Sequence, residues 1–197
     1  MTELLLVLLG LCIGLAGVAL FLRYYGFQGQ NPSDYAHQGP ELDIRKHLNG
    51  PIICEGVLYG PIGRVNARFV ADFDASWDGN TGVMKEHFRY DSGTTQDREW
   101  TLHWHTDGRV TATAADIIGE AVGEQNGPSL VLRYRIKLPA SAGGHVLDVT
   151  DWMYVVETGT IVNRSQFRKF GLKVAELVAV MRPHHSQFLE EEPKEAA

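Results

Sequence analysis

The chain has 197 residues, of which 44% are hydrophobic, and a formal net charge of −6. This length fits one domain with accessory segments, and the apolar content is sufficient for a core. No basic stripe is present, which argues against a nucleic acid partner. The two cysteines, Cys12 and Cys54, provide no disulfide framework.

The first segment has the composition of a membrane anchor. The run Leu4–Leu22 contains no charged side chain, and its length is close to the ~20 residues that cross a bilayer as a helix. Tyr24 and Tyr25 follow it at the depth expected of interfacial aromatic residues. We predict a membrane-spanning helix within residues 1–27. The alternatives are a buried core helix and a cleaved signal peptide, although no Lys or Arg precedes the run.

Cys12 is a candidate for lipid attachment. Lipoprotein processing requires a small residue before the cysteine, and Leu11 occupies that position. An ordinary apolar cysteine in a helix is therefore the alternative. Arg23 is the positive side chain beside the run, and it favours a cytoplasmic location for the downstream domain.

Three segments frame the folded domain. Residues 28–40 are polar and contain Gly, Pro, Asn and Ser, which is typical of a linker. Residues 41–48 are predicted to form one or two helical turns, ended by Asn49-Gly50-Pro51. Residues 184–197 are acidic and low in apolar side chains, which predicts a disordered tail. The domain is expected to occupy residues 41–183.

Strict alternation of apolar and polar residues indicates strands in this domain. In the run Val65–Trp77, Phe69, Phe73 and Trp77 share one parity with the alanines, and charged residues occupy the other. Short Gly-containing turns separate such runs. The predicted strands are residues 52–59, 65–77, 83–90, 98–105, 109–114 continued by 117–123, 130–138, 145–157, 160–167 and 172–181. The strand at 109–123 is expected to bend at Gly119.

Eight or nine strands joined by short turns, with no helix between them, predict an all-β antiparallel meander. Closure of the sheet removes its exposed edges. We therefore expect an up-and-down, lipocalin-like β-barrel of 8–9 strands, and a two-sheet sandwich is the alternative. The short helix before the first strand is expected to plug one end of the barrel.

Several motifs occur along the domain in a fixed order. They are Leu42-Asp43-Ile44 with Gly50-Pro51, Ser76-Trp77-Asp78-Gly79, Arg98-Glu99-Trp100-Thr101-Leu102, the run Ala115–Ala121, Asp151-Trp152-Met153-Tyr154, Ile161-Val162-Asn163-Arg164 and Lys169-Phe170-Gly171. By these motifs, residues 42–181 resemble a family of bacterial lipoprotein-like sequences, the domain of unknown function 3833.

The resemblance implies an envelope protein of Gram-negative bacteria, with a lipocalin-like barrel that faces the periplasm and a part in lipid or fatty-acid modification. The family has no established catalytic residues, so none is carried over. The resemblance outweighs the single Arg23. We therefore expect a single-pass protein of the inner membrane, with its domain in the periplasm.

Histidines provide a candidate metal site. His103 and His105 are two residues apart on a predicted strand and share a face, a spacing found in some metal sites. Their parity is opposite to that of Trp100, Leu102 and Trp104, so we expect exposed histidines and no bound metal. No other cofactor is expected, because the chain lacks a phosphate loop and a dinucleotide fingerprint.

Two pairs of carboxylates are candidates for acid–base chemistry: Asp116 with Glu120, and Asp148 with Asp151. The alternative is that they cap turns or face water. Asp151 shares its parity with apolar neighbours, and a buried aspartate must find hydrogen-bond partners. We expect Arg164 or Lys169 to provide them.

The inward-facing aromatic and aliphatic residues form the remaining candidate site. A barrel of about eight strands is either filled by side chains or holds one small ligand. We predict a site for a lipid or fatty acyl chain, with the membrane as a second partner through the helix. The predicted lining is Phe69, Phe73, Trp77, Phe88, Trp100, Leu102, Trp104, Leu132, Tyr134 and Ile136. The alternatives are a ligand-free envelope protein that acts through an unidentified protein partner, and a lipid-modifying enzyme with polar groups converging in the cavity.

Overall fold

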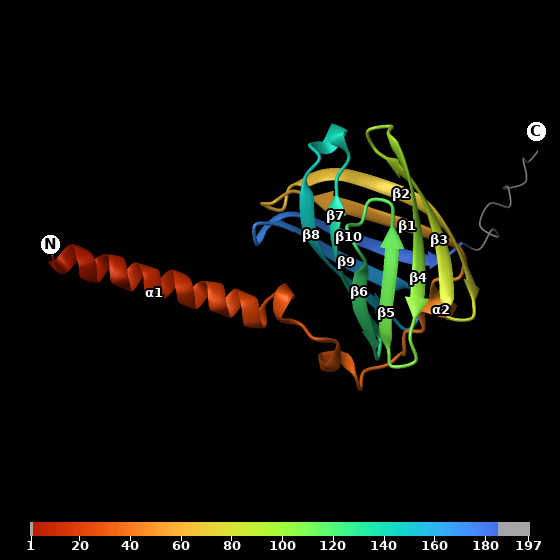
Figure 1. Cartoon of the computed structure of the whole chain (residues 1–197), viewed down its shortest axis with the longest axis horizontal. Helices are drawn as coiled ribbons and strands as arrows, with labels where there is room; N and C mark the ends of the chain where they lie inside the picture. The colour runs from red at the N-terminus through yellow and green to blue at the C-terminus, as the bar shows by residue number, and fades with distance from the viewer. Residues whose placement is uncertain (1, 185–197) are drawn as a thin grey trace, which may run out of the picture.

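The alternating runs form ten antiparallel strands in the computed structural model, which describes residues 2–184 (Figure 1). The predicted tail beyond His184 lies outside the described residues. The strands are β1 (Gly50–Tyr59), β2 (Val65–Asp78), β3 (Thr81–Tyr90), β4 (Thr95–Trp104), β5 (Arg109–Ala114), β6 (Ala121–Asn126), β7 (Ser129–Lys137), β8 (Val146–Val155), β9 (Ile161–Lys169) and β10 (Leu172–Pro183).

Each strand pairs with the next along the chain, and β1 pairs with β10 to close the barrel. The closing pairs run from Ile52 opposite Pro183 to Tyr59 opposite Glu176. Closure satisfies the backbone groups that an open sheet would leave exposed at its edges. The up-and-down barrel is confirmed, and the two-sheet sandwich is wrong.

The prediction of eight or nine strands is wrong by one strand, at residues 109–123. This run is not one bent strand: β5 ends at Ala114, and β6 begins at Ala121 and returns antiparallel to it. Gly119 adopts φ 77° within the connecting loop, a conformation that glycine tolerates better than other residues. The run therefore forms a hairpin, which adds the tenth strand.

One end of the barrel, which we call the closed end, is plugged by the residues before β1. These include the short helix α2 (Ile44–His47), and Leu42, Ile44 and Leu48 are all buried. The indole nitrogen of Trp77 on β2 donates a hydrogen bond to the Leu48 carbonyl oxygen at 2.7 Å. The plug predicted from the sequence is thus present.

The segment predicted as a linker packs on the outside of the barrel. It contains two 3-10 helices, η1 (Phe27–Gly29) and η2 (Pro32–Tyr35). Tyr35 makes edge contacts with Trp152 and Tyr154, which lie on the outer face of β8. Trp152 is therefore fully buried although it faces away from the interior.

The N-terminal helix α1 (Thr2–Tyr25) projects away from the barrel (Figure 1). It has no buried residue, and Cys12 is exposed on its surface. Its length and composition suit a membrane span, and a signal sequence would have the same features. The helix is therefore a candidate membrane anchor.

Candidate functional site

The barrel interior contains a cavity of about 420 Å³. It extends from Leu48 on the plug to Leu58, Leu147 and Phe167 near the opposite end, which we call the open end. Ligand pockets in proteins typically occupy about 300–1,000 Å³ and are mostly apolar with a few polar groups. The interior is therefore not solidly packed, and its size suits one small hydrophobic molecule.

Eight of the ten residues predicted to bind a ligand line this cavity. They are Phe69, Phe73, Phe88, Trp100, Leu102, Leu132, Tyr134 and Ile136. Trp77 and Trp104 are not part of the lining. Both lie at the closed end, where Trp77 contacts Leu48 and the ring of Trp104 lies under the Arg45 guanidinium. These two tryptophans hold the plug.

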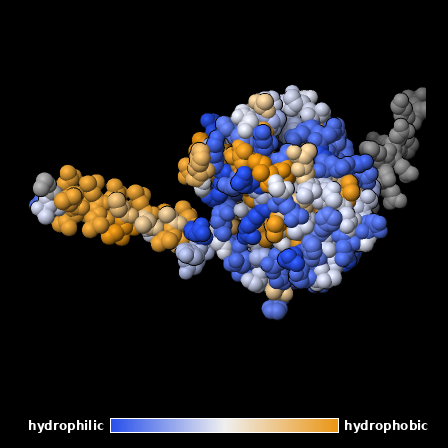
Figure 2. Space-filling view, in the orientation of Figure 1, coloured by the Kyte–Doolittle hydropathy of each residue, from blue (hydrophilic) through white to orange (hydrophobic). Residues whose placement is uncertain are grey.

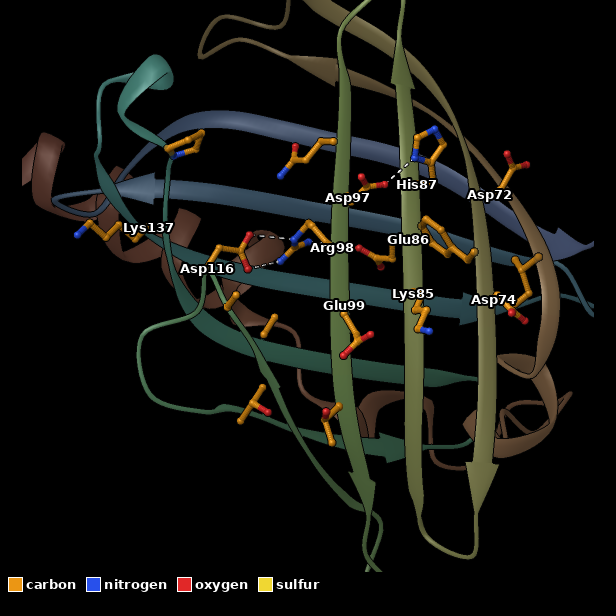
Figure 3. Close-up of a pocket in the computed structure, with 18 of the residues that line it drawn as sticks. Asp72, Asp74, Lys85, Glu86, His87, Asp97, Arg98, Glu99, Asp116 and Lys137 are labelled. Atoms are coloured by element: carbon orange, nitrogen blue, oxygen red, sulfur yellow. Dashed lines mark hydrogen bonds and ion pairs between the residues drawn. The ribbon is translucent and has the colours of Figure 1, made fainter.

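A row of charged residues crosses the cavity wall from β3 to the loop after β5 (Figure 3). Glu86 and Arg98 are opposite each other in the β3–β4 ladder, with 3.6 Å between Arg98 Nη1 and Glu86 Oε2. Arg98 Nε lies 2.9 Å from Asp116 Oδ2, and Arg98 Nη2 donates to Asp116 Oδ1 at 3.0 Å. One guanidinium thus lies between two carboxylates.

Glu86 is the more deeply buried of these two carboxylates. Burial raises its pKa to about 7, although the positive charge of Arg98 opposes the shift. Its Oε2 atom has no hydrogen-bond partner within the described protein. A carboxyl with a pKa near 7 exchanges a proton at physiological pH, and it has an oxygen free to meet a polar group.

A second polar group lies on β8 and β9. Asp151 Oδ1 accepts hydrogen bonds from Asn163 Nδ2 at 2.5 Å and from Ser165 Oγ at 2.8 Å. The Tyr134 hydroxyl donates to its other oxygen at 3.4 Å. Burial nevertheless raises the pKa of Asp151.

The prediction that Arg164 or Lys169 partners Asp151 is wrong. Arg164 lies on the outer parity of β9 and pairs with Glu176. Lys169 lies next to His145. Neutral side chains on the inner parity solvate Asp151 instead, because the inward-facing neighbours across the ladder are Asn163 and Ser165.

The cavity opens through the wall beside β4. Residues 95–99 of β4 pair with β3 but have no partner on their other side, because β5 reaches only as far as Trp100. A wide pocket on this side shares wall residues with the interior cavity. The shared residues are Phe73, Glu86, Gln96, Arg98, Asp116, Lys137, Leu138 and Pro139. The ion pair of Arg98 with Asp116 therefore lies at a lateral mouth (Figure 3).

The remaining candidates do not assemble into a site. Within residues 2–184 no group of three His, Cys, Asp or Glu side chains has the geometry to hold a metal ion. His103 instead lies 3.1 Å from the Thr81 hydroxyl. Glu120 and Asp148 are exposed, whereas Asp116 and Asp151 face the cavity. Neither predicted carboxylate pair is therefore brought together.

Glu86 and Arg98 are the buried ion pair of the cavity wall, and neither was among the predicted site residues. Glu86 shares its parity with Met84 and Phe88 on β3, and Arg98 shares its parity with Trp100 on β4. A charged residue on an inward parity was the signal available. Their positions directly opposite each other depend on the β3–β4 register, which the turn between the strands sets.

A closed barrel with one plugged end and an internal cavity is a lipocalin-like fold. The family model named "Protein of unknown function (DUF3833)" matches residues 21–183, so the chain belongs to this family. A comparison with curated proteins gives no match.

Two solved structures share the fold. The S-type phycobiliprotein lyase CPES from Guillardia theta has a TM-score of 0.55 and 8% identity, covering 80% of this chain and 99% of the lyase. Rv2717c from M. tuberculosis has a TM-score of 0.51 and 16% identity, covering 75% of this chain and 99% of the other. At these identities the likeness concerns the fold.

Proposed function

We propose that the barrel binds one lipid or fatty acyl chain in its cavity, as a membrane-anchored protein of the bacterial envelope. The observation that carries the proposal is the cavity of about 420 Å³ inside the barrel. A barrel of this size can be filled entirely by side chains, and this one is not. The lipocalin-like fold of the neighbouring structures supports a hydrophobic ligand.

The polar row at the mouth suits the polar end of such a ligand. An acyl chain would lie along Phe69, Phe88 and Leu132, and its oxygen atoms would reach Glu86 and Arg98. The buried Oε2 of Glu86, which has the Arg98 ion pair but no hydrogen bond within the described residues, gains a hydrogen bond in this arrangement. The ligand is therefore proposed to enter apolar end first, through the lateral mouth.

Two features support an envelope location. The helix α1 is long and apolar enough to cross a membrane, and no residue of it packs against the barrel. The family resemblance implies a periplasmic domain. We therefore place the barrel in the periplasm, held at the inner membrane by α1.

The test is lipid extraction from the full-length chain, purified from bacterial membranes in mild detergent, followed by mass spectrometry. Ala175→Phe places a ring in the cavity lining, whereas Val178→Phe on the same strand places it on the outer face. We expect one lipid per chain in the wild type and in Val178→Phe, and none in Ala175→Phe. Equal lipid content in the two variants would contradict the proposal.

A lipid-modifying enzyme is the second candidate, and the pKa of Glu86 favours it. A general acid or base works best when its pKa is near the operating pH, and the pKa of Glu86 is about 7. In this case Glu86→Gln would retain the bound lipid, and its chemical form would change from product to substrate. Identical lipids in the wild type and Glu86→Gln would indicate binding without turnover.

A further inference from the structure

Two neighbouring turns at the open end carry exposed apolar side chains. The turn between β1 and β2 holds Ile62, 84% exposed, with Val65 at the start of β2. The turn between β9 and β10 holds Phe170, 91% exposed, followed by Leu172 at 73%. Because β1 pairs with β10, these turns are adjacent. Single exposed apolar residues are common on protein surfaces, but a cluster of large ones marks an interaction site.

Phe170 is in a backbone conformation that its side chain disfavours. Its φ is 52°, and it is the one non-glycine residue with positive φ among residues 2–184. Two-residue hairpin turns of this type strongly prefer Asn-Gly, since a bulky residue at positive φ is strained. The ring packs into no core that would compensate for this strain. A strained, exposed aromatic residue at a turn therefore points to an external contact.

The charges of both turns have one sign. Residues 59–65 contain Arg64, and residues 168–173 contain Arg168, Lys169 and Lys173, and neither stretch contains an acidic residue. Some of these cations have partners, since Lys173 pairs with Glu176. The net charge of the two turns still favours a negatively charged surface, such as anionic lipid headgroups.

The path of the chain before the barrel places α1 on the same side. Gln30 bonds to Tyr154, and Gln28 bonds to Thr150, so toward its N-terminus the chain follows β8 from the closed end toward the open end. Figure 1 shows α1 and both turns projecting toward the same side of the barrel. Figure 2 shows apolar residues along α1 and also on the side of the barrel from which it projects.

We propose that the two turns insert into the headgroup boundary of the bilayer that α1 crosses, and that anionic phospholipids form the surface they bind. The inference rests on the membrane-spanning role proposed for α1. Apolar side chains enter the boundary between headgroups and acyl chains, and flanking Lys and Arg contact the headgroups. The barrel would then be fixed with its open end against the membrane that supplies its ligand.

Spin labelling of the full-length chain in vesicles of phosphatidylethanolamine and phosphatidylglycerol tests this contact. The background is Cys12→Ser. The native Cys54 is buried and its pKa is raised to about 12, so it resists labelling. Single cysteines replace Phe170 and Ile62 at the open end, Thr158 at the exposed turn of the closed end, and Val18 within α1. Collisions with oxygen report lipid exposure, and collisions with a water-soluble nickel complex report water exposure.

We expect the labels at 170 and 62 to collide less with nickel and more with oxygen than the label at 158 does. Equal nickel exposure at 170 and 158, with the label at 18 in lipid, would overturn the docking and leave the anchor intact. Protection of 170 from both reagents would indicate a protein partner and would also overturn it. A water-exposed label at 18 would refute the anchor itself and, with it, this inference. None of these readouts depends on ligand in the cavity.

Discussion

The two ends of the barrel are built from the same alternating strands but differ in what lies beyond them. At the closed end, Leu42, Ile44 and Leu48 fill the opening and are fully buried. At the open end, Ile62, Phe170 and Leu172 remain exposed. Every strand has a paired neighbour on each side, and apart from the gap beside residues 95–99 of β4 the two ends differ in their connecting segments. The closed end therefore buries apolar side chains that contribute stability, whereas the open end leaves comparable side chains exposed.

The turns reinforce this contrast. The turns of the closed end are polar, with Asp78-Gly79 between β2 and β3 and Asp107-Gly108 between β4 and β5. These residues suit tight reversals in water. The turn Phe170-Gly171 at the open end instead holds an exposed aromatic side chain at a positive φ, where Asn or Gly is preferred. Proteins break such local rules mainly at functional sites, and the proposed membrane contact of Phe170 fits that pattern.

The largest expected effect comes from opening the closed end. Leu48→Ala removes a fully buried side chain from the plug, so we expect the free energy of unfolding to fall by about 3 kcal/mol, within the usual range for buried leucines. Leu172→Ala is the matched change at the open end, and its effect should stay within about 0.5 kcal/mol. Urea unfolding of both variants measures this. Equal losses would refute the division between the two ends.

The next effect concerns the charged row at the mouth. Glu86 has a pKa raised from 4.5 to about 7, so the folded state binds its proton more tightly than the unfolded state does. The stability that comes from this tighter proton binding by Glu86 is fully present below pH 4.5 and is lost as the pH rises through about 7. The loss amounts to about 3 kcal/mol, since one pKa unit corresponds to about 1.4 kcal/mol.

Glu86→Gln should remove this dependence. Asp151 has a raised pKa too, so the measured quantity is the difference in unfolding free energy between wild type and variant at pH 5 and at pH 8. We expect the unfolding free energy of the variant to increase relative to that of the wild type between pH 5 and pH 8. A difference that stays constant across this range would show that Glu86 is not held in a desolvated site.

The smallest effect is expected at the open-end turn. Asn tolerates the left-handed conformation that strains Phe170, so Phe170→Asn should stabilise the protein by about 1 kcal/mol. The gain allows for the loss of the exposed contact between Lys169 and the ring, which is worth about 0.5 kcal/mol. Thermal or urea unfolding of the full-length chain measures the change. A destabilised variant would mean that Phe170 serves the fold.

The main features of the fold were predictable because alternation and turn chemistry act locally. The runs around Phe69 and Leu132 indicated strands, and the absence of intervening helices indicated a closed meander. The hairpin at residues 109–123 is not evident from the sequence, because a single Gly119 is equally compatible with a bend in one strand. The loop of this hairpin brings Asp116 to Arg98 across the mouth. That contact joins a strand to the loop after the next strand, and alternation along one strand does not predict it.

The site was predictable in its apolar part and in the burial of Asp151. Inward parity identified Phe69 or Trp100 as lining residues, but Glu86 and Arg98 are opposite each other only in the actual register. The predicted partners of Asp151 are also wrong, because Arg164 lies on the outer parity of β9 and Lys169, at the end of that strand, contacts His145. Trp152 is buried by Tyr35, about 117 residues earlier, which no strand pattern encodes.

The most direct test of a lipid inside the barrel uses the tryptophans of the full-length chain in nanodiscs. All four tryptophans lie in the barrel, and Trp100 lines the cavity. We expect phospholipids brominated on their acyl chains to quench part of the fluorescence, and Trp100→Phe to lose that part, because an acyl chain reaches the interior. Identical quenching in the wild type and Trp100→Phe would contradict an acyl chain beside Trp100, and with it the proposed ligand site.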